Sequence, residues 1–163
     1  GCDSGPGMKL AILAVGHKPP AWVAQGCAEY QKRMPRELPL SIVEVKPESR
    51  GSKNREQLLA AEKVRLVAAL QGYARMVVLD ERGADLPTLK LAERLAAWMR
   101  AGGDTAFVIG GADGIDAALK LQADDAIRLS SLTLPHALAR LILCEQLYRA
   151  ISIVRQHPYH REG

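Results

Sequence analysis

A glycine-rich turn comes directly after an apolar strand pattern in the last third of the chain. Residues 105–109 have the sequence TAFVI, and GGADG (residues 110–114) follows them. Glycine lets a backbone approach a ligand closely and adopt positive φ, so this turn can cradle a small molecule. The turn is not GxGxxG, it does not follow the first strand, and the chain has no GxxxxGK[ST]. An ordinary dinucleotide fold and a P-loop hydrolase are therefore both disfavoured.

A second candidate segment, residues 129–134, alternates leucines with hydroxyl residues and has the sequence LSSLTL. Such a segment can offer backbone amides and carbonyls to the edge of a flat heterocycle, and apolar side chains to its faces. The structural alternative is a strand extension followed by a turn. His136 comes just after Pro135, where it can orient this loop or contact a ligand, and we favour the structural role.

The C-terminal tail, residues 156–162, is polar, aromatic and basic, with the sequence QHPYHRE. Tyr159 can stack on a nucleic-acid base and Arg161 can contact phosphate, although a frayed terminus is the alternative. The formal net charge of +4 and the pI of about 9.1 are compatible with such a partner. A basic loop at residues 46–55 is a candidate lid or RNA-contacting segment, or simply solvated surface. Its cations are Lys46, Arg50, Lys53 and Arg55.

Five short apolar runs alternate with helical patterns and must position these segments. This order predicts an α/β fold, with a mainly parallel sheet covered by helices on both faces. Ligands of such sheets bind outside the carboxyl ends of the strands, where Leu79, Gly110 and residues 129–134 all fall. We expect Trp22, Val23, Cys27 and Tyr30 on the buried side of the first helix, and Thr88 as a helix cap. The expected strands are residues 9–15, 40–45, 75–79, 105–109 and 126–129, and residues 80–83 are expected to be a loop.

The predicted last helix, which starts at Pro135, is apolar on nearly all sides. Its polar residues include Glu145, Arg149 and Ser152, which form one narrow stripe. A helix that is apolar all round must be buried all round. Either it is the central helix of a monomer, or a second copy of the chain covers it, and we favour the dimer.

The composition indicates one globular domain of 163 residues, with no apolar run near the roughly 18 residues that a membrane span needs. We expect residues 1–7 to be the remnant of an expression tag, and residues 8–163 to form a single domain. Residues 1–7 contain Cys2, so two other cysteines remain, Cys27 and Cys144. Both are expected to be buried free thiols, as in a reducing cytoplasm. The spacing of cysteines and histidines predicts no metal site. No nucleophile-and-base pattern or carboxylate pair stands out. The chemistry is therefore expected to belong to a bound cofactor.

Five segments, taken together and in order, resemble one protein family over residues 8–162. They are MKLAILAVG, VVLDERG, FVIGGADG, LSSLTLPHALARLILCEQLYRA and HPYHRE. The chain resembles the ribosomal RNA large-subunit methyltransferase H family of the SPOUT class. The resemblance implies S-adenosylmethionine-dependent methylation of pseudouridine N3 in 23S ribosomal RNA, within the assembled 70S ribosome. It also implies a C-terminal deep trefoil knot, and a homodimer whose active site joins one subunit's cofactor pocket to the partner's surface.

The resemblance also implies roles for individual residues. The expected cofactor-binding residues are Leu79, Gly110, Leu129, Ser130, Ser131, Leu132, Thr133 and Leu134. Substrate positioning is expected of Tyr159, His160 and Arg149, chosen from a wider set that adds His136, Arg140, Tyr148 and Arg161. A non-catalytic RNA-binding protein and a nucleotide-binding oxidoreductase are the alternatives. The missing GxGxxG counts against the oxidoreductase.

Overall fold

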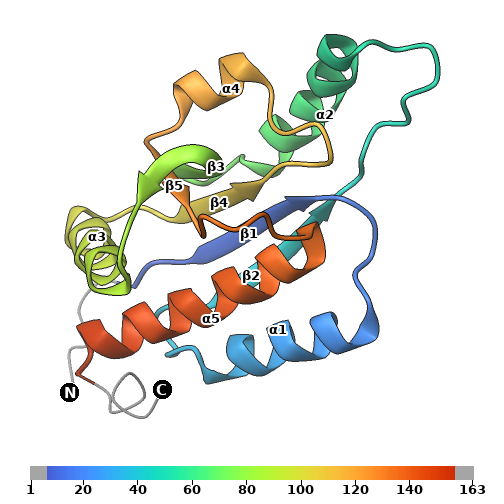
Figure 1. The fold of residues 1–163 in the computed structure, drawn as a ribbon. Helices are drawn as coiled ribbons and strands as arrows, with labels where there is room; N and C mark the ends of the chain where they lie inside the picture. Colours follow the sequence, from blue (N-terminus) through green and yellow to red (C-terminus); the bar gives the residue numbers. More distant parts are fainter. Residues whose placement is uncertain (1–6, 157–163) are drawn as a thin grey trace.

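The computed structural model describes residues 7–156, which form one five-stranded sheet between two layers of helices (Figure 1). The strand order is β2-β1-β4-β3-β5 and every pairing is parallel, as the alternation of strands and helices predicts. The strands are β1 (Leu10–Val15), β2 (Leu40–Val45), β3 (Arg75–Asp85), β4 (Thr105–Ile109) and β5 (Asp125–Arg128). The helices are α1 (Ala21–Arg33), α2 (Arg55–Ala69), α3 (Thr88–Ala101), α4 (Ala117–Gln122) and α5 (His136–Val154).

The central strands β1 and β4 are buried on both faces of the sheet, and their successive side chains point to opposite sides. In β1, Leu10 and Ile12 join the core beneath α1, α3 and α5, while Ala11 and Leu13 join the core beneath α2 and α4. Phe107 of β4 is fully buried in the first of these cores. The two cores fix the strands from both sides, so the loops at the strand ends project from a rigid base.

The third strand is longer than the sequence pattern predicts, and the expected loop at residues 80–83 is wrong. The strand continues to Asp85 after a register shift, so that both Leu79 and Ala84 pair with Ile127 of β5. Gly83 permits this pairing. A Cβ atom there would lie 2.6 Å from the carbonyl carbon of Ile127. A bulge of this kind re-aims the chain at the end of a strand.

Two details of the helices also differ from expectation. Trp22 was expected on the buried side of α1, but its side chain is 60% exposed, and the buried residues of the helix are Val23 and Cys27. Neighbouring positions on a helix point about 100° apart, so Trp22 falls outside the narrow contact stripe. Thr88 does not cap α3. Its hydroxyl donates to Gln146 at 2.7 Å and ties α3 to α5.

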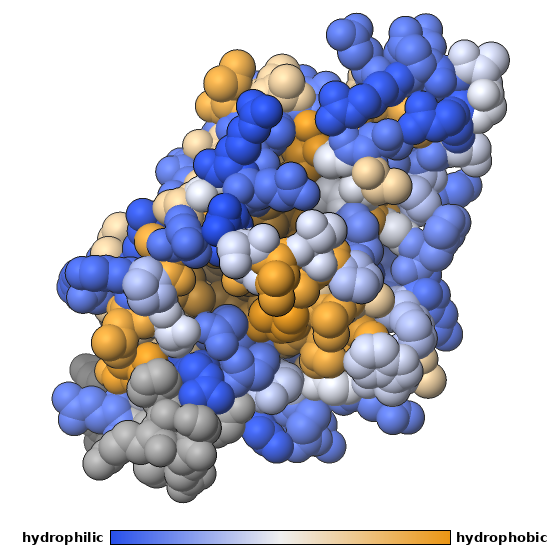
Figure 2. Space-filling view, in the orientation of Figure 1, coloured by the Kyte–Doolittle hydropathy of each residue, from blue (hydrophilic) through white to orange (hydrophobic). Residues whose placement is uncertain are grey.

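The last helix, α5, packs between α1 and α3, and only part of its apolar surface is buried (Figure 1). Leu143, Cys144 and Leu147 are fully buried, whereas Leu141 and Ile142 are only partly covered. Figure 2 shows apolar surface gathered over the N-terminal half of this helix. Within residues 7–156, no helix is long and apolar enough to cross a membrane.

The close approach of Gly83 to Ile127 leads to a stability prediction. We expect Gly83→Ala to lower the free energy of unfolding by about 1–3 kcal/mol, because the new methyl group would overlap backbone that cannot easily move. Gly51→Ala is the control: its Cβ would meet nothing within 4 Å, although its φ is +50°. It should cost only about 1 kcal/mol of backbone strain. Urea denaturation measures the free energy of unfolding of both variants. Equal losses of stability would contradict the tight packing of β3 against β5.

Candidate functional site

Three segments expected to form one site lie at the same edge of the sheet. β4, β3 and β5 are consecutive neighbours and all parallel, so their carboxyl ends open side by side. Leu79 lies in β3, Gly110 directly follows β4, and residues 129–134 follow β5. Leu79 and Leu129 are half-buried and pack against the same core cluster. The topology therefore brings together the segments that the sequence singled out.

The glycine turn after β4 is compact and depends on the absence of side chains. Gly110 is buried, and a Cβ atom there would lie 2.5 Å from the carbonyl oxygen of Gly114 and 2.6 Å from Ile115. The turn closes through a hydrogen bond from the Gly114 N–H to the Gly111 carbonyl, at 3.0 Å. Gly114 has φ +90°, in the region that favours glycine. A side chain at Gly110 would clash with the turn itself, so the compact shape of the turn requires glycine at this position.

The segment after β5 combines a fixed base with an exposed tip. Leu129 and Ser130 are half-buried, and the Ser130 hydroxyl accepts a hydrogen bond from the Leu132 N–H at 2.9 Å. Ser131, Leu132 and Thr133 are exposed, and 74% of Leu132 is open to solvent. An exposed leucine beside backbone polar groups matches the apolar wall and polar edge that a flat heterocycle requires. The residues present therefore fit an adenosyl group.

Of the residues expected to position the substrate, only Arg149 lies in the described part of the chain. Tyr159, His160 and Arg161 lie outside it. Arg149 is largely buried and pairs with Glu145 at 3.0 Å. It lies 13 residues beyond the first residue of α5, which is about 20 Å along a helix axis. Arg149 is therefore far from the strand-end segments of the same chain.

Of the other candidates on α5, Tyr148 and Arg140 have structural partners. The Tyr148 ring packs against Tyr30 of α1, with 6.0 Å between centroids. Arg140 is only 5% exposed and pairs with Glu44 of β2 at 2.8 Å, while its Nε atom has no hydrogen-bond partner among the described residues. His136 is exposed at the start of α5. His136 is therefore the candidate from α5 that lies nearest in sequence to the strand-end segments.

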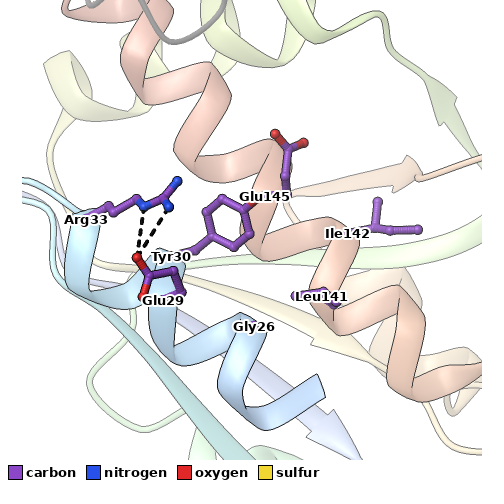
Figure 3. Close-up of a pocket in the computed structure, with 7 residues that line it drawn as sticks. All are labelled: Gly26, Glu29, Tyr30, Arg33, Leu141, Ile142 and Glu145. Carbon is purple, nitrogen blue, oxygen red and sulfur yellow. Dashed lines mark hydrogen bonds and ion pairs between the residues drawn. The ribbon is translucent and has the colours of Figure 1, made fainter. Parts of the chain in front are cut away.

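A groove of about 490 Å³ runs between α1 and α5, away from the strand ends (Figure 3). At its base the two helices approach closely, because a Cβ atom on Gly26 would lie 2.8 Å from Leu141. Arg33 covers the Tyr30 ring at 5.4 Å and pairs with Glu29 at its rim. The lining residues are Gly26, Glu29, Tyr30, Arg33, Leu141, Ile142 and Glu145. Sequence periodicity did not reveal this groove, because it depends on a glycine in one helix facing a leucine in another.

The two helices also share the buried thiols. Cys27 and Cys144 are both free and buried, as expected. The hydrogen bond with Cys27 and burial raise the pKa of the Cys144 thiol well above its usual range. Among residues 7–156, no cluster of three or more histidine, cysteine or acidic side chains could hold a metal ion.

Sequence reasoning missed the acidic residues that organise the edge of the site. Asp113 of the glycine turn accepts hydrogen bonds from Arg50 and Arg55 of the basic loop. Glu62 of α2 is only 4% exposed, and its carboxylate lies about 3.5 Å from where a Gly111 Cβ would be. The one available signal was an aspartate inside a glycine turn. Its partners, about sixty residues away, were not evident from the sequence.

Comparison with known proteins identifies close relatives along nearly the whole chain. A family model described as "Predicted SPOUT methyltransferase" matches residues 8–160. The chain is 67% identical over 156 residues to ribosomal RNA large subunit methyltransferase H of Dechloromonas aromatica, covering 96% of this chain and 100% of the relative. It is 57% identical to the protein of the same name from Nitrosospira multiformis, covering 94% and 99% of the two chains.

Solved structures share the fold at low sequence identity. A probable methylase family protein from Haemophilus influenzae superposes with a TM-score of 0.57 at 15% identity, covering 93% of this chain and 69% of that one. A probable methyltransferase from Bordetella pertussis gives a TM-score of 0.54 at 14% identity, covering 90% and 95%. At such identities the likeness extends to the arrangement of sheet and helices alone.

The ion pair between the buried Arg140 and the exposed Glu44 gives a second stability prediction. Glu44→Ala leaves a guanidinium in the core without its partner, and we expect the free energy of unfolding to fall by about 1–3 kcal/mol. Glu93→Ala breaks the exposed Lys90–Glu93 pair and should cost less than about 0.5 kcal/mol. Urea denaturation at low salt compares the two variants. If they lose the same stability, the Arg140–Glu44 pair is not a significant tie between α5 and the sheet.

Proposed function

The chain belongs to the SPOUT methyltransferases and, within them, to the ribosomal RNA large subunit methyltransferase H family, and we propose that it methylates N3 of a pseudouridine in 23S ribosomal RNA. Enzymes of this class use S-adenosylmethionine, which supplies an electrophilic methyl group when bound. The observation that carries the proposal is the 67% identity to a relative over that relative's full length. We also propose that the protein works in the cytoplasm, on the assembled 70S ribosome.

The strand-end segments are the proposed cofactor pocket. Gly110 leaves room for the backbone of its turn, Leu79 forms a wall, and Leu129, Ser130, Ser131, Leu132, Thr133 and Leu134 enclose the heterocycle. Methyl transfer needs the acceptor nitrogen in line with the methyl group in a site that excludes water. The exposed Leu132 is well placed to exclude water once the pocket is filled.

The proposed fold includes a C-terminal trefoil knot. Its support is the extension of β3 to Asp85, which pairs with Ile127 of β5 a second time after the register shift. The chain leaving β5 is proposed to thread past this extension before α5 begins. Such threading would hold residues 129–134 against β3 without any covalent tie.

A homodimer is the proposed assembly, with the active site shared between subunits. Arg149 lies about 20 Å along α5 from the pocket side, and the tail begins beyond the far end of that helix. A pocket on a second copy would bring Arg149, Tyr159 and His160 to the cofactor. There Arg149 would stabilise the electron-rich base as its N3 proton leaves. The partly covered apolar surface of α5 supports this contact (Figure 2).

The assigned pocket leads to a binding prediction. Leu132→Asp should weaken S-adenosylmethionine binding by about tenfold or more, because it removes an apolar wall. Leu132 is 74% exposed, so its replacement should leave the fold intact, and Leu121→Asp, at an 88% exposed leucine on α4, is the matched control. Calorimetry measures both dissociation constants. An unchanged constant for Leu132→Asp would exclude residues 129–134 as a wall of the pocket.

Methyl transfer itself is tested with tritiated cofactor and 70S ribosomes from a strain that lacks this enzyme. We expect transfer by the wild type, and none by Gly110→Val or by a chain truncated before Tyr159. Mixing the two inactive variants should restore partial activity, because each shared site needs a pocket from one copy and a tail from the other. Absence of transfer by the wild type, with RNA still bound, would favour a non-catalytic RNA-binding protein. If the wild type transfers the methyl group but the mixture of the two variants does not, the shared site is contradicted.

A further inference from the structure

The basic loop between β2 and α2 is held firmly at its first half. The Glu48 N–H donates to the buried Glu62 carboxylate at 3.0 Å. The Glu48 side chain pairs with Arg65 at 2.7 Å and with Lys53 at 3.5 Å, and the Arg65 hydrogen bond holds the pKa of Glu48 below its usual range. Arg65 also donates to the Lys46 carbonyl at 3.0 Å. Of the loop's cations, Lys53 is thus paired with a carboxylate of the protein itself.

The second half of the loop is fastened to the glycine turn. One guanidinium nitrogen of Arg50 lies 2.7 Å from each carboxylate oxygen of Asp113. Arg55, the first residue of α2, donates to the Asp113 main-chain carbonyl at 2.8 Å. Two arginines therefore bind Asp113: Arg50 binds its side chain and Arg55 its backbone carbonyl. Asp113 is the neighbour of Gly114, which carries the positive φ of the turn.

A second set of contacts supports the turn from the same side. Lys63 of α2 lies 3.8 Å from Asp116, which caps α4 directly after the turn. The buried Glu62 carboxylate lies beneath Gly111 and also holds the Glu48 N–H of the loop. The glycines lack side chains that could pack and fix the turn. Besides the Gly114–Gly111 hydrogen bond, the turn is therefore held by these charged contacts from the loop and from α2.

We propose that Arg50 and Arg55 are positioning residues for the cofactor-binding turn. Through their contacts with Asp113, they hold the turn in the shape that binds the cofactor. The inference rests on the proposed function, because it assigns the turn to the cofactor. It also gives the basic loop a role other than contacting RNA phosphate. Coupling between binding sites is reciprocal, so a cofactor bound to the turn would in return stabilise the loop in its docked position.

The test is a double-mutant cycle on the dissociation constant of S-adenosylmethionine, measured by calorimetry. Arg50→Ala and Asp113→Asn should each raise that constant about three- to fivefold, as expected for the loss of one partly exposed ion pair. The double variant should be no weaker than either single variant, because both remove the same contact. Lys53→Ala is the matched control. It removes a cation of the same loop whose partner is Glu48 rather than the turn, so it should change the constant less than twofold.

Further readouts separate positioning from the alternatives. The reversed pair, Arg50→Asp with Asp113→Arg, should recover part of the lost affinity, and the melting temperatures of all variants should stay close to that of the wild type. If Arg50→Ala raises the KM for ribosomes and leaves cofactor affinity intact, Arg50 contacts RNA phosphate and the inference is overturned. Equal affinities for Arg50→Ala and Lys53→Ala also overturn it. A wild-type protein that binds no cofactor would instead contradict the proposed function itself.

Discussion

The parallel pairing of every strand is the constraint on which the site depends. Parallel neighbours send all their carboxyl ends to one edge of the sheet, and each crossover helix returns the chain to the opposite edge. Leu79, Gly110 and residues 129–134 are far apart in sequence, yet they meet because β3, β4 and β5 are adjacent. Burial of both faces by two helix layers then fixes the strands, so the loops carry the chemistry and the sheet determines where they lie.

Much of this architecture can be predicted from local patterns. The apolar runs ending at Val15 and Ile109 match the observed strand ends, because a strand buried on both faces has an unbroken hydrophobic signature. The edge strand β2 also ends at Val45 as predicted, although most of its residues are not buried. The convergence of three strand ends also follows from topology alone. The assignment of individual cofactor-binding residues required the family resemblance, since alternating leucines and hydroxyls are equally compatible with an ordinary turn.

Three of the features that the sequence did not predict involve pairs of residues distant in the chain. The continuation of β3 depends on Gly83 fitting against Ile127, and the groove depends on Gly26 facing Leu141. The Arg50–Asp113 contact joins residues 63 positions apart. Trp22 lies on a helix with only two buried residues, so a small error in the predicted contact stripe moves it from core to surface. Periodicity describes which face of an element is apolar, but not which partner that face will meet.

The two tryptophans occupy contrasting surroundings. Trp98 is partly buried on α3, where its ring lies 6.0 Å from Phe107 and beneath the guanidinium of Arg75. Trp22 stands 60% exposed on α1. Intrinsic fluorescence therefore has two separable sources, one sensitive to loss of the packed interior and the other to whatever covers the outer surface of α1. With Trp98 replaced by phenylalanine, the emission of Trp22 would become an optical probe of assembly that needs no attached dye.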